Sequence, residues 1–238
     1  MARSPKSGYM KDNKGRRLDS AMSERVRPQT IVYMGDSLTE DGGVAAAQKA
    51  GTGAINRSYV ALGFATWAQT LSGHRLRLLR NLGVAGNTTA QIRARIADVL
   101  ALEPGYVHDM SGTNNLTTDE LLAQAKIDKL AMWDAYDEAG IRVITGPVFP
   151  QGTYTADTRR RTDDLNEWIR NTTEGRENIV FVDYFAALAL FSGEYQIGFN
   201  RDTFHLAAQD RPGAGGAVVG IALQAIAEVV DDIAITIR

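Results

Sequence analysis

Short apolar, β-branched runs alternate with amphipathic stretches along the chain from Pro28 onward. Five of the runs have the pattern of strands, and these are Thr30–Met34, Leu76–Leu82, Tyr106–Met110, Arg142–Thr145 and Asn178–Val182. The spacing of apolar positions predicts helices in Tyr59–Leu71, Thr88–Leu102, Thr118–Ala139, Thr158–Thr173 and Ala214–Val230. Apolar strands that alternate with helices are typical of a parallel sheet covered on both faces. The pattern therefore predicts an α/β fold, without an internal repeat or a second domain.

The ends of the predicted strands indicate where a ligand would bind. In open parallel sheets, the loops at the carboxyl ends of the strands converge on the ligand site. Residues that carry chemistry are therefore expected in the loops that follow Met34, Leu82, Met110, Thr145 and Val182.

Composition restricts the class of protein. The 238 residues are 23% charged and 44% hydrophobic, with a formal net charge of −2, as in an ordinary globular domain. The absence of cysteine excludes disulfides, thiolate nucleophiles and cysteine-bound zinc. The start of the chain lacks the apolar segment of a secretory signal, and no run approaches the roughly 18 apolar residues of a membrane span. We therefore expect a cytoplasmic protein without a membrane span.

The first 28 residues differ from the rest in charge. They hold eight Lys and Arg against three Asp and Glu, a surplus of five positive charges that leaves −7 for the remainder. Such a patch could contact a polyanion, but its composition favours a solvated, disordered tail. We expect residues 1–28 to be a disordered basic tail and residues 29–238 to form one domain, with no nucleic acid as a partner.

The loop after the first predicted strand carries a candidate nucleophile. It reads GDSLTE from Gly35 to Glu40, so Ser37 stands directly after a buried strand. A serine hydroxyl is a poor nucleophile unless a base lies within hydrogen-bond reach. Taken alone, this short sequence favours a different reading, in which Ser37 merely caps a helix.

The next two loops carry candidate hydrogen-bond donors. Residues 81–87 read NLGVAGN, and the glycine at Gly86 would let the backbone N–H approach a ligand closely. Residues 111–115 read SGTNN, where the Asn114 amide could donate to a developing oxyanion. Each sequence is also an ordinary turn, which is the usual role of glycine and asparagine.

A candidate base lies near the other end of the chain. Asp202 and His205 are three residues apart in RDTFHL, a spacing that places both on one side of a helical turn. The carboxylate could then orient the imidazole. The two other histidines fit worse, because His74 precedes the second strand and His108 lies within the third. His205 is therefore the candidate base.

These four segments, in this order and spacing, resemble the sequence blocks of the SGNH (GDSL-type) hydrolases. The resemblance extends from about Ile31 to Ile226. It implies a three-layer α/β/α, flavodoxin-like fold, which agrees with the sheet predicted above. No G-x-S-x-G elbow is present, so the larger α/β-hydrolase family does not match.

The resemblance also implies roles for individual residues. Ser37 resembles the nucleophile, Asp202 the acid and His205 the base. The backbone N–H groups of Ser37 and Gly86, with the Asn114 side chain, resemble the oxyanion hole. The implied protein is a serine esterase that hydrolyses carboxylic esters through an acyl-enzyme, with neither a cofactor nor a metal.

Several residues depart from this pattern or compete for a role. Asn115 stands where the family usually has aspartate, and we expect a structural effect only. Asp109 would be costly inside a buried strand without a partner. Asp36 is expected to tie down the Ser37 loop, and Asp183 resembles a common structural aspartate of the family.

By analogy with the family, the substrate is expected to be a small-molecule or carbohydrate ester with a short acyl group, for example acetyl on a sugar. The segments Phe149–Thr155 and Tyr195–Phe204 offer aromatic residues for a pocket wall. The same residues could transfer the acyl group to an alcohol other than water. A third alternative is a carbohydrate-binding or structural module without turnover, and the sequence indicates no oligomeric state.

Overall fold

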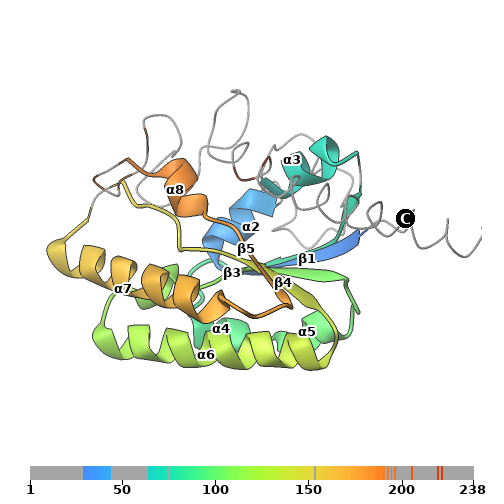
Figure 1. The fold of residues 1–238 in the computed structure, drawn as a ribbon, viewed down its shortest axis with the longest axis horizontal. Helices are drawn as coiled ribbons and strands as arrows, with labels where there is room; N and C mark the ends of the chain where they lie inside the picture. The colour runs from blue at the N-terminus through green and yellow to red at the C-terminus, as the bar shows by residue number, and fades with distance from the viewer. Residues whose placement is uncertain are drawn as a thin grey trace, which may run out of the picture.

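The computed structural model describes residues 29–43, 64–73, 75–152 and 154–190, together with Ser192, Glu194, Gln196, His205, Val219 and Ile221. Within this part of the chain, five parallel strands form one sheet in the order β2-β1-β3-β4-β5 (Figure 1). The strands are β1 (Gln29–Gly35), β2 (Leu76–Gly83), β3 (Tyr106–Met110), β4 (Arg142–Thr145) and β5 (Ile179–Phe181). The five predicted strands are confirmed, each to within one residue at either end.

Helices cover both faces of this sheet (Figure 1). One face carries α4 (Thr89–Arg93), α5 (Ile96–Leu100), α6 (Asp119–Glu138) and α7 (Ala156–Thr173). The other face carries α2 (Ser37–Gly43), α3 (Phe64–Leu71) and α8 (Tyr184–Leu188). A short 3-10 helix, η3 (Thr113–Asn115), follows β3. The architecture is the predicted three-layer α/β/α sandwich with a central parallel sheet.

The side chains of β1 show how one sheet supports two cores. Ile31 and Tyr33 pack on one face of the sheet with Phe64 and the other buried residues of α3 and α8. Val32 and Met34 pack on the opposite face with the buried residues of α4, α6 and α7. Because successive strand residues point to opposite faces, a strand buried on both sides must be apolar throughout. This explains the apolar run Ile31–Met34 in the buried part of β1.

The single helix predicted over Thr88–Leu102 is wrong in its middle, because α4 and α5 are separate helices. Arg95 lies between them with φ −108° and ψ 14°, outside the helical region. Its guanidinium donates hydrogen bonds to the Leu82 carbonyl at 2.6 Å and to Asn87 Oδ1 at 3.0 Å. The break therefore occurs where a side chain reaches back to the end of β2.

Helices α6 and α7 lie close to their predicted bounds. Thr118 caps α6 by accepting from the Leu121 N–H at 3.2 Å, and Thr155 caps α7 by accepting from the Thr158 N–H at 3.1 Å. Because Thr155 supplies the cap, α7 begins at Ala156, two residues before its predicted start.

Some predicted segments fall partly or wholly outside the described residues. Of Tyr59–Leu71, residues 64–71 form α3. Of Ala214–Val230, only Val219, which is buried in the core, and Ile221 are described. Residues 1–28 lie outside the described residues, so the tail and the domain boundary stay predictions. No helix in the described ranges combines the length and apolar character needed to cross a bilayer.

Candidate active site

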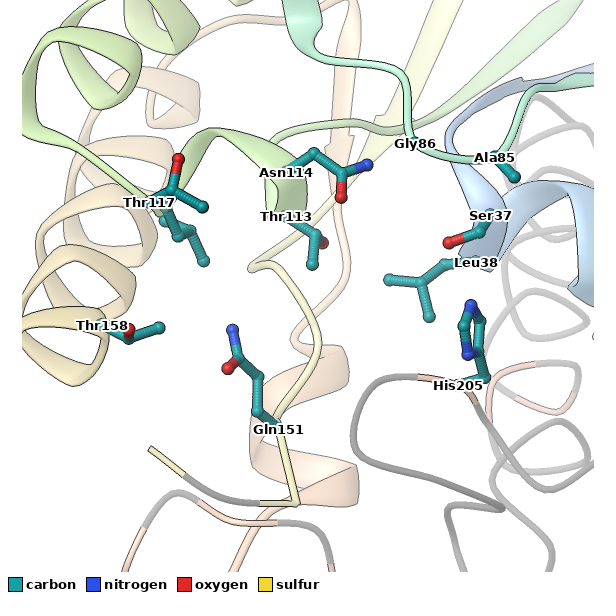
Figure 2. Close-up of a pocket in the computed structure, with 11 residues that line it drawn as sticks. Ser37, Leu38, Ala85, Gly86, Thr113, Asn114, Thr117, Gln151, Thr158 and His205 are labelled. Carbon is teal, nitrogen blue, oxygen red and sulfur yellow. The ribbon is translucent and has the colours of Figure 1, made fainter. Parts of the chain in front are cut away.

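A cavity of about 530 Å³ is lined by residues that follow β1, β2, β3 and β4 (Figure 2). Four of the five predicted site residues line it, namely Ser37, Gly86, Asn114 and His205. The fifth, Asp202, lies outside the described residues. The cavity therefore brings together side chains and backbone from four segments that are far apart in the sequence, as expected for loops at the carboxyl ends of parallel strands.

The end of β1 fixes the position of Ser37, the first residue of α2. Asp36 accepts a hydrogen bond from the Leu38 N–H on Oδ1 at 3.0 Å and from the Glu40 N–H on its carbonyl at 2.9 Å. Asp36 thus ties down the loop, as the sequence predicts. Figure 2 shows the Ser37 hydroxyl directed into the cavity, with the His205 ring at the same end.

The carboxyl group of Asp36 is itself unusual. The residue is fully buried, and its Oδ2 has no hydrogen-bond partner in the part of the chain that the structure describes. Burial raises the pKa of Asp36 to about 7, although the Leu38 N–H and the charge of Lys129 act in the opposite direction. A titratable carboxyl group therefore adjoins Ser37 without lining the cavity.

The loop after β2 presents Gly86 to the cavity. Gly86 has a φ of +79°, a left-handed conformation that a side chain would strain. The loop is held against α2, because the Ala85 N–H donates to the Glu40 carboxylate at 2.9 Å. At Gly83 an added Cβ would lie 2.2 Å from the Glu40 backbone nitrogen, so this close approach requires glycine.

The Asn114 side chain is held by the same loop. Its Nδ2 donates to the Asn87 carbonyl at 3.0 Å, and the Asn87 side chain in turn accepts from Arg95. An amide nitrogen carries two N–H groups. One N–H of Asn114 therefore anchors the side chain, and the other has no hydrogen-bond partner among the described residues.

Asn115 has a structural position, in agreement with the role expected for it. Its Oδ1 accepts from the Thr89 N–H at 3.0 Å, and its Nδ2 donates to Thr89 Oγ1 at 3.1 Å and to the Leu121 carbonyl at 3.0 Å. An aspartate at this position could not donate to Leu121. The amide links the start of α4 to the start of α6 and does not line the cavity.

The structure explains the buried Asp109 of β3. Its carboxylate accepts from Lys129 Nζ at 2.9 Å, Trp133 Nε1 at 2.9 Å and the Ser111 hydroxyl at 2.6 Å. Burial alone would raise the pKa of Asp109, but Lys129, Ser111 and Trp133 together hold it below the usual value. Asp109 is therefore a paired structural group on the α6 side of the sheet.

His108 is excluded as a base by its surroundings. The ring is fully buried among the aromatic rings of Tyr33, Phe64 and Tyr184, with centroids 5.3–5.6 Å away. Its Nε2 shares a hydrogen bond with Tyr184 Oη at 2.9 Å. Burial lowers the pKa of His108 to about 3, so the ring is neutral at physiological pH. His74 lies outside the described residues.

The cavity also has lining residues that the sequence did not single out. Among them are Thr117, Gln151 and Thr158, which belong to no sequence block. The expectation of an aromatic wall is wrong for Phe149, which is buried in the core against Tyr184. Gln151 from the same loop faces the cavity instead, and no periodicity or motif could have indicated this.

The described residues include no group of three or more His, Asp and Glu side chains that could hold a metal ion. The described residues that line the cavity offer hydroxyls, amides, backbone N–H groups and the His205 imidazole. Such groups can activate a hydroxyl and stabilise an oxyanion through hydrogen bonds.

The three-layer fold, with a serine, a glycine, an asparagine and a histidine around one cavity at the strand ends, defines the protein as an SGNH-type hydrolase. Residues 33–209 match the GDSL-like lipase/acylhydrolase family, and the chain belongs to that family. The expected membership is therefore confirmed, and the protein is a carboxylic ester hydrolase.

Individual relatives agree with this assignment. The chain is 27% identical to an acetylxylan esterase of Geobacillus stearothermophilus over 173 residues, 67% of this chain and 77% of the relative. A GDSL-like lipase from Bacteroides thetaiotaomicron has the same fold, with a TM-score of 0.64, 17% identity and coverage of 89% and 97% of the two chains. A variant of a Geobacillus acetyl-xylooligosaccharide esterase gives a TM-score of 0.62 at 22% identity, covering 84% and 94%.

Proposed function

We propose that the protein is a serine esterase that uses Ser37 as nucleophile, His205 as general base and Asp202 to orient His205. The observation that carries this proposal is the cavity itself. Ser37, Gly86, Asn114 and His205 come from four separate segments and line the same cavity. A hydroxyl and an imidazole beside backbone and amide N–H donors are the groups that acyl transfer requires.

The reaction begins when Ser37 Oγ attacks the ester carbonyl carbon while His205 takes the hydroxyl proton. The oxygen of the tetrahedral intermediate accepts hydrogen bonds from the N–H groups of Ser37 and Gly86 and from Asn114 Nδ2. His205 then gives its proton to the departing alcohol, which leaves an acyl-enzyme on Ser37. Water then attacks this ester while His205 takes a proton from it. The second tetrahedral intermediate breaks down, His205 returns the proton to Ser37 Oγ, and the carboxylic acid is released.

The proposed substrate is a short-acyl ester, and an acetyl group on a carbohydrate is the favoured case. Sequence similarity to an acetylxylan esterase supports this choice. A cavity of about 530 Å³ lies within the range that encloses ligands of drug-like size. An alcohol part as large as a sugar ring is therefore compatible with the cavity. Transfer to an acceptor alcohol would use the same acyl-enzyme.

Hydrolysis of p-nitrophenyl acetate tests the proposal. The wild type is expected to release p-nitrophenol and to react covalently with a fluorophosphonate, whereas Ser37→Ala should do neither, since the attacking oxygen is gone. Ser192→Ala is the matched control, because Ser192 is exposed and does not line the cavity. A wild type that neither turns over nor is labelled would instead indicate a binding module without turnover.

Asn114→Ala tests the oxyanion donor separately. The loss of one preorganised donor is expected to cost about 2.7–4 kcal/mol of transition-state stabilisation, seen as a fall in kcat of about 10²–10³. Fluorophosphonate labelling should remain detectable, because the nucleophile is unchanged. A kcat close to that of the wild type would remove Asn114 from the mechanism.

A further inference from the structure

The cavity has a polar wall on the side away from Ser37. Figure 2 shows Thr117, Thr158 and Gln151 on that side, whereas Leu38 and His205 lie at the Ser37 end. Thr117 lies between η3 and α6, Thr158 lies in the first turn of α7, and Gln151 lies in the loop after β4. Each carries a hydroxyl or an amide that can both donate and accept a hydrogen bond.

Gln151 is the most informative residue of this wall. Only 5% of its surface is exposed, and Figure 2 shows its side-chain amide directed into the cavity. In the described part of the chain, that amide has no hydrogen-bond partner, in contrast to the backbone N–H of Gln151, which donates to Tyr154 Oη at 3.1 Å. The amide lines the cavity and can therefore exchange hydrogen bonds with a bound ligand.

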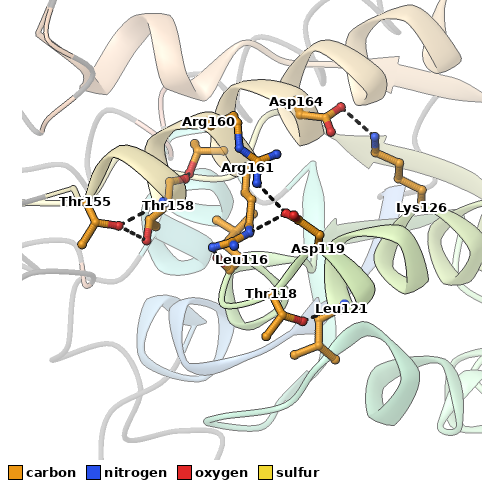
Figure 3. Close-up of polar contacts among 11 residues, drawn as sticks. Leu116, Thr118, Asp119, Leu121, Lys126, Thr155, Thr158, Arg160, Arg161 and Asp164 are labelled. Carbon is orange, nitrogen blue, oxygen red and sulfur yellow. Dashed lines mark hydrogen bonds and ion pairs between the residues drawn. The ribbon is translucent and has the colours of Figure 1, made fainter.

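Hydrogen bonds and an ion pair hold the segments that carry Thr117 and Thr158 (Figure 3). Arg161 of α7 donates to the Asp119 carboxylate at 2.8 Å and to the Leu116 carbonyl at 3.5 Å, next to Thr117. The Thr155 and Thr158 hydroxyls share a hydrogen bond of 2.9 Å at the start of α7. Contacts that hold a wall in place reduce the entropy lost when a ligand binds.

The cavity is large enough to hold both the acyl group and the alcohol part of an ester. An acetyl group bound beside Ser37 would fill only a small part of about 530 Å³. The rest of the cavity, which includes the polar wall, remains for the alcohol part. An alcohol with several hydroxyls can exchange hydrogen bonds with the amide and the threonine hydroxyls, whereas an apolar alcohol would displace water from the Gln151 amide without replacing its hydrogen bonds.

We infer that Gln151, with Thr117 and Thr158, forms the alcohol subsite of this enzyme and selects esters of polyhydroxylated alcohols. The inference rests on the proposed function, because it assumes that the ester carbonyl lies at Ser37. Gln151 exchanges hydrogen bonds with one hydroxyl of the alcohol, its N–H donating and its carbonyl accepting. Thr117 and Thr158 then contact hydroxyls further along the alcohol.

Gln151→Met tests the inference, because methionine keeps the length of the side chain and removes the amide. The probes are a monoacetylated methyl pyranoside and cyclohexyl acetate, which place a hydroxylated and an apolar six-membered ring at the same position. We expect kcat/KM for the pyranoside to fall about tenfold relative to that for cyclohexyl acetate, as one hydrogen bond is lost and a substrate hydroxyl is left unpaired.

Thr158→Val should lower the ratio of kcat/KM for the pyranoside to kcat/KM for cyclohexyl acetate about threefold. Thr172→Val is its matched control, because Thr172 lies near the other end of α7 and does not line the cavity. The melting temperature of Gln151→Met should be close to that of the wild type, since the amide has no hydrogen-bond partner among the described residues and the substitution keeps the length of the side chain. A clear fall in melting temperature would assign Gln151 a structural role and overturn the inference.

Two further outcomes would also overturn it. An equal loss of activity on the acetylated pyranoside and on cyclohexyl acetate would show that Gln151 does not recognise the hydroxyls of the alcohol. A change that instead follows acyl-chain length in p-nitrophenyl esters would place the acyl group, and not the alcohol, against this wall. Failure of the proposed function would give a different result from these outcomes. In that case Ser37→Ala would hydrolyse both esters as fast as the wild type.

Discussion

Two buried aspartates on neighbouring strands have opposite electrostatic environments. Asp36 follows β1 and Asp109 lies on β3, and the two strands pair in register with Gly35 opposite Met110. Both carboxyl groups are almost completely buried. Asp109 has three side-chain donors, whereas among the described residues only the Leu38 N–H donates to the carboxyl group of Asp36.

Because the two carboxyl groups have different partners, the pKa of one is lowered and the pKa of the other is raised, although both are buried. The donors around Asp109 hold its pKa below the usual value, because they favour the charged form of its carboxyl group. Burial dominates at Asp36 and raises its pKa to about 7, so it is largely protonated in mildly acidic solution. Burial by itself therefore does not determine the charge of a carboxyl group, because the number and charge of its donors can outweigh it.

The largest effect in this comparison is expected from Lys129→Met. Removal of the ammonium leaves a buried carboxylate without its countercharge and should lower the free energy of unfolding by about 3–5 kcal/mol. Urea unfolding at pH 7 measures the loss. Lys126→Met is the matched control on the same helix, because Lys126 pairs with Asp164 at the surface, where such a pair contributes at most about 1 kcal/mol. Equal losses in the two variants would contradict the assignment of Asp109 as a paired structural anion.

The next effect concerns the pH dependence of stability. The folded protein keeps the Asp36 proton up to about pH 7, whereas the unfolded chain loses it near pH 4. Stability from this group is therefore complete below pH 4 and falls by up to about 1.4 kcal/mol per pH unit between pH 4 and 7. Asp36→Asn should remove this slope, as measured by urea unfolding at several pH values. An unchanged slope would show that Asp36 ionises normally.

The smallest effect is expected from Trp133→Phe. The variant removes one donor to the Asp109 carboxylate, and a hydrogen bond to a charged group contributes about 1.5–3 kcal/mol. Trp168→Phe provides the control, because Trp168 stacks on Trp133 with centroids 5.8 Å apart and offers a ring of the same size. Thermal unfolding of both variants separates the hydrogen bond from ring packing. If Trp168→Phe were the more destabilising, packing alone would account for Trp133.

Much of the fold could be predicted because its signals are local. The strands β1 and β3 are apolar, β-branched or aromatic over most of their length, and helices α6 and α7 have threonine caps at their starts. Family membership followed from the order of four short sequence blocks. Ser37, Gly86 and Asn114 could be selected because parallel strands bring their carboxyl-end loops together.

The features that could not be predicted depend on contacts between distant segments. The break at Arg95 reflects bonds to Leu82 and Asn87, which a helical periodicity cannot show. The pairing of Lys129 with Asp109 joins a helix to a strand, although a lysine on the buried face of α6 was a signal that could have revealed it. Gln151 carried no signal at all.

The anchored amide of Asn114 has a consequence for turnover in the proposed mechanism. One of its N–H groups is already committed to the Asn87 carbonyl at 3.0 Å, which fixes the plane of the amide and the direction of the other N–H. The rotational freedom of this donor is lost when the chain folds, so each catalytic cycle begins with the dipole aligned. The activation entropy then contains no contribution from turning that side chain toward the oxyanion.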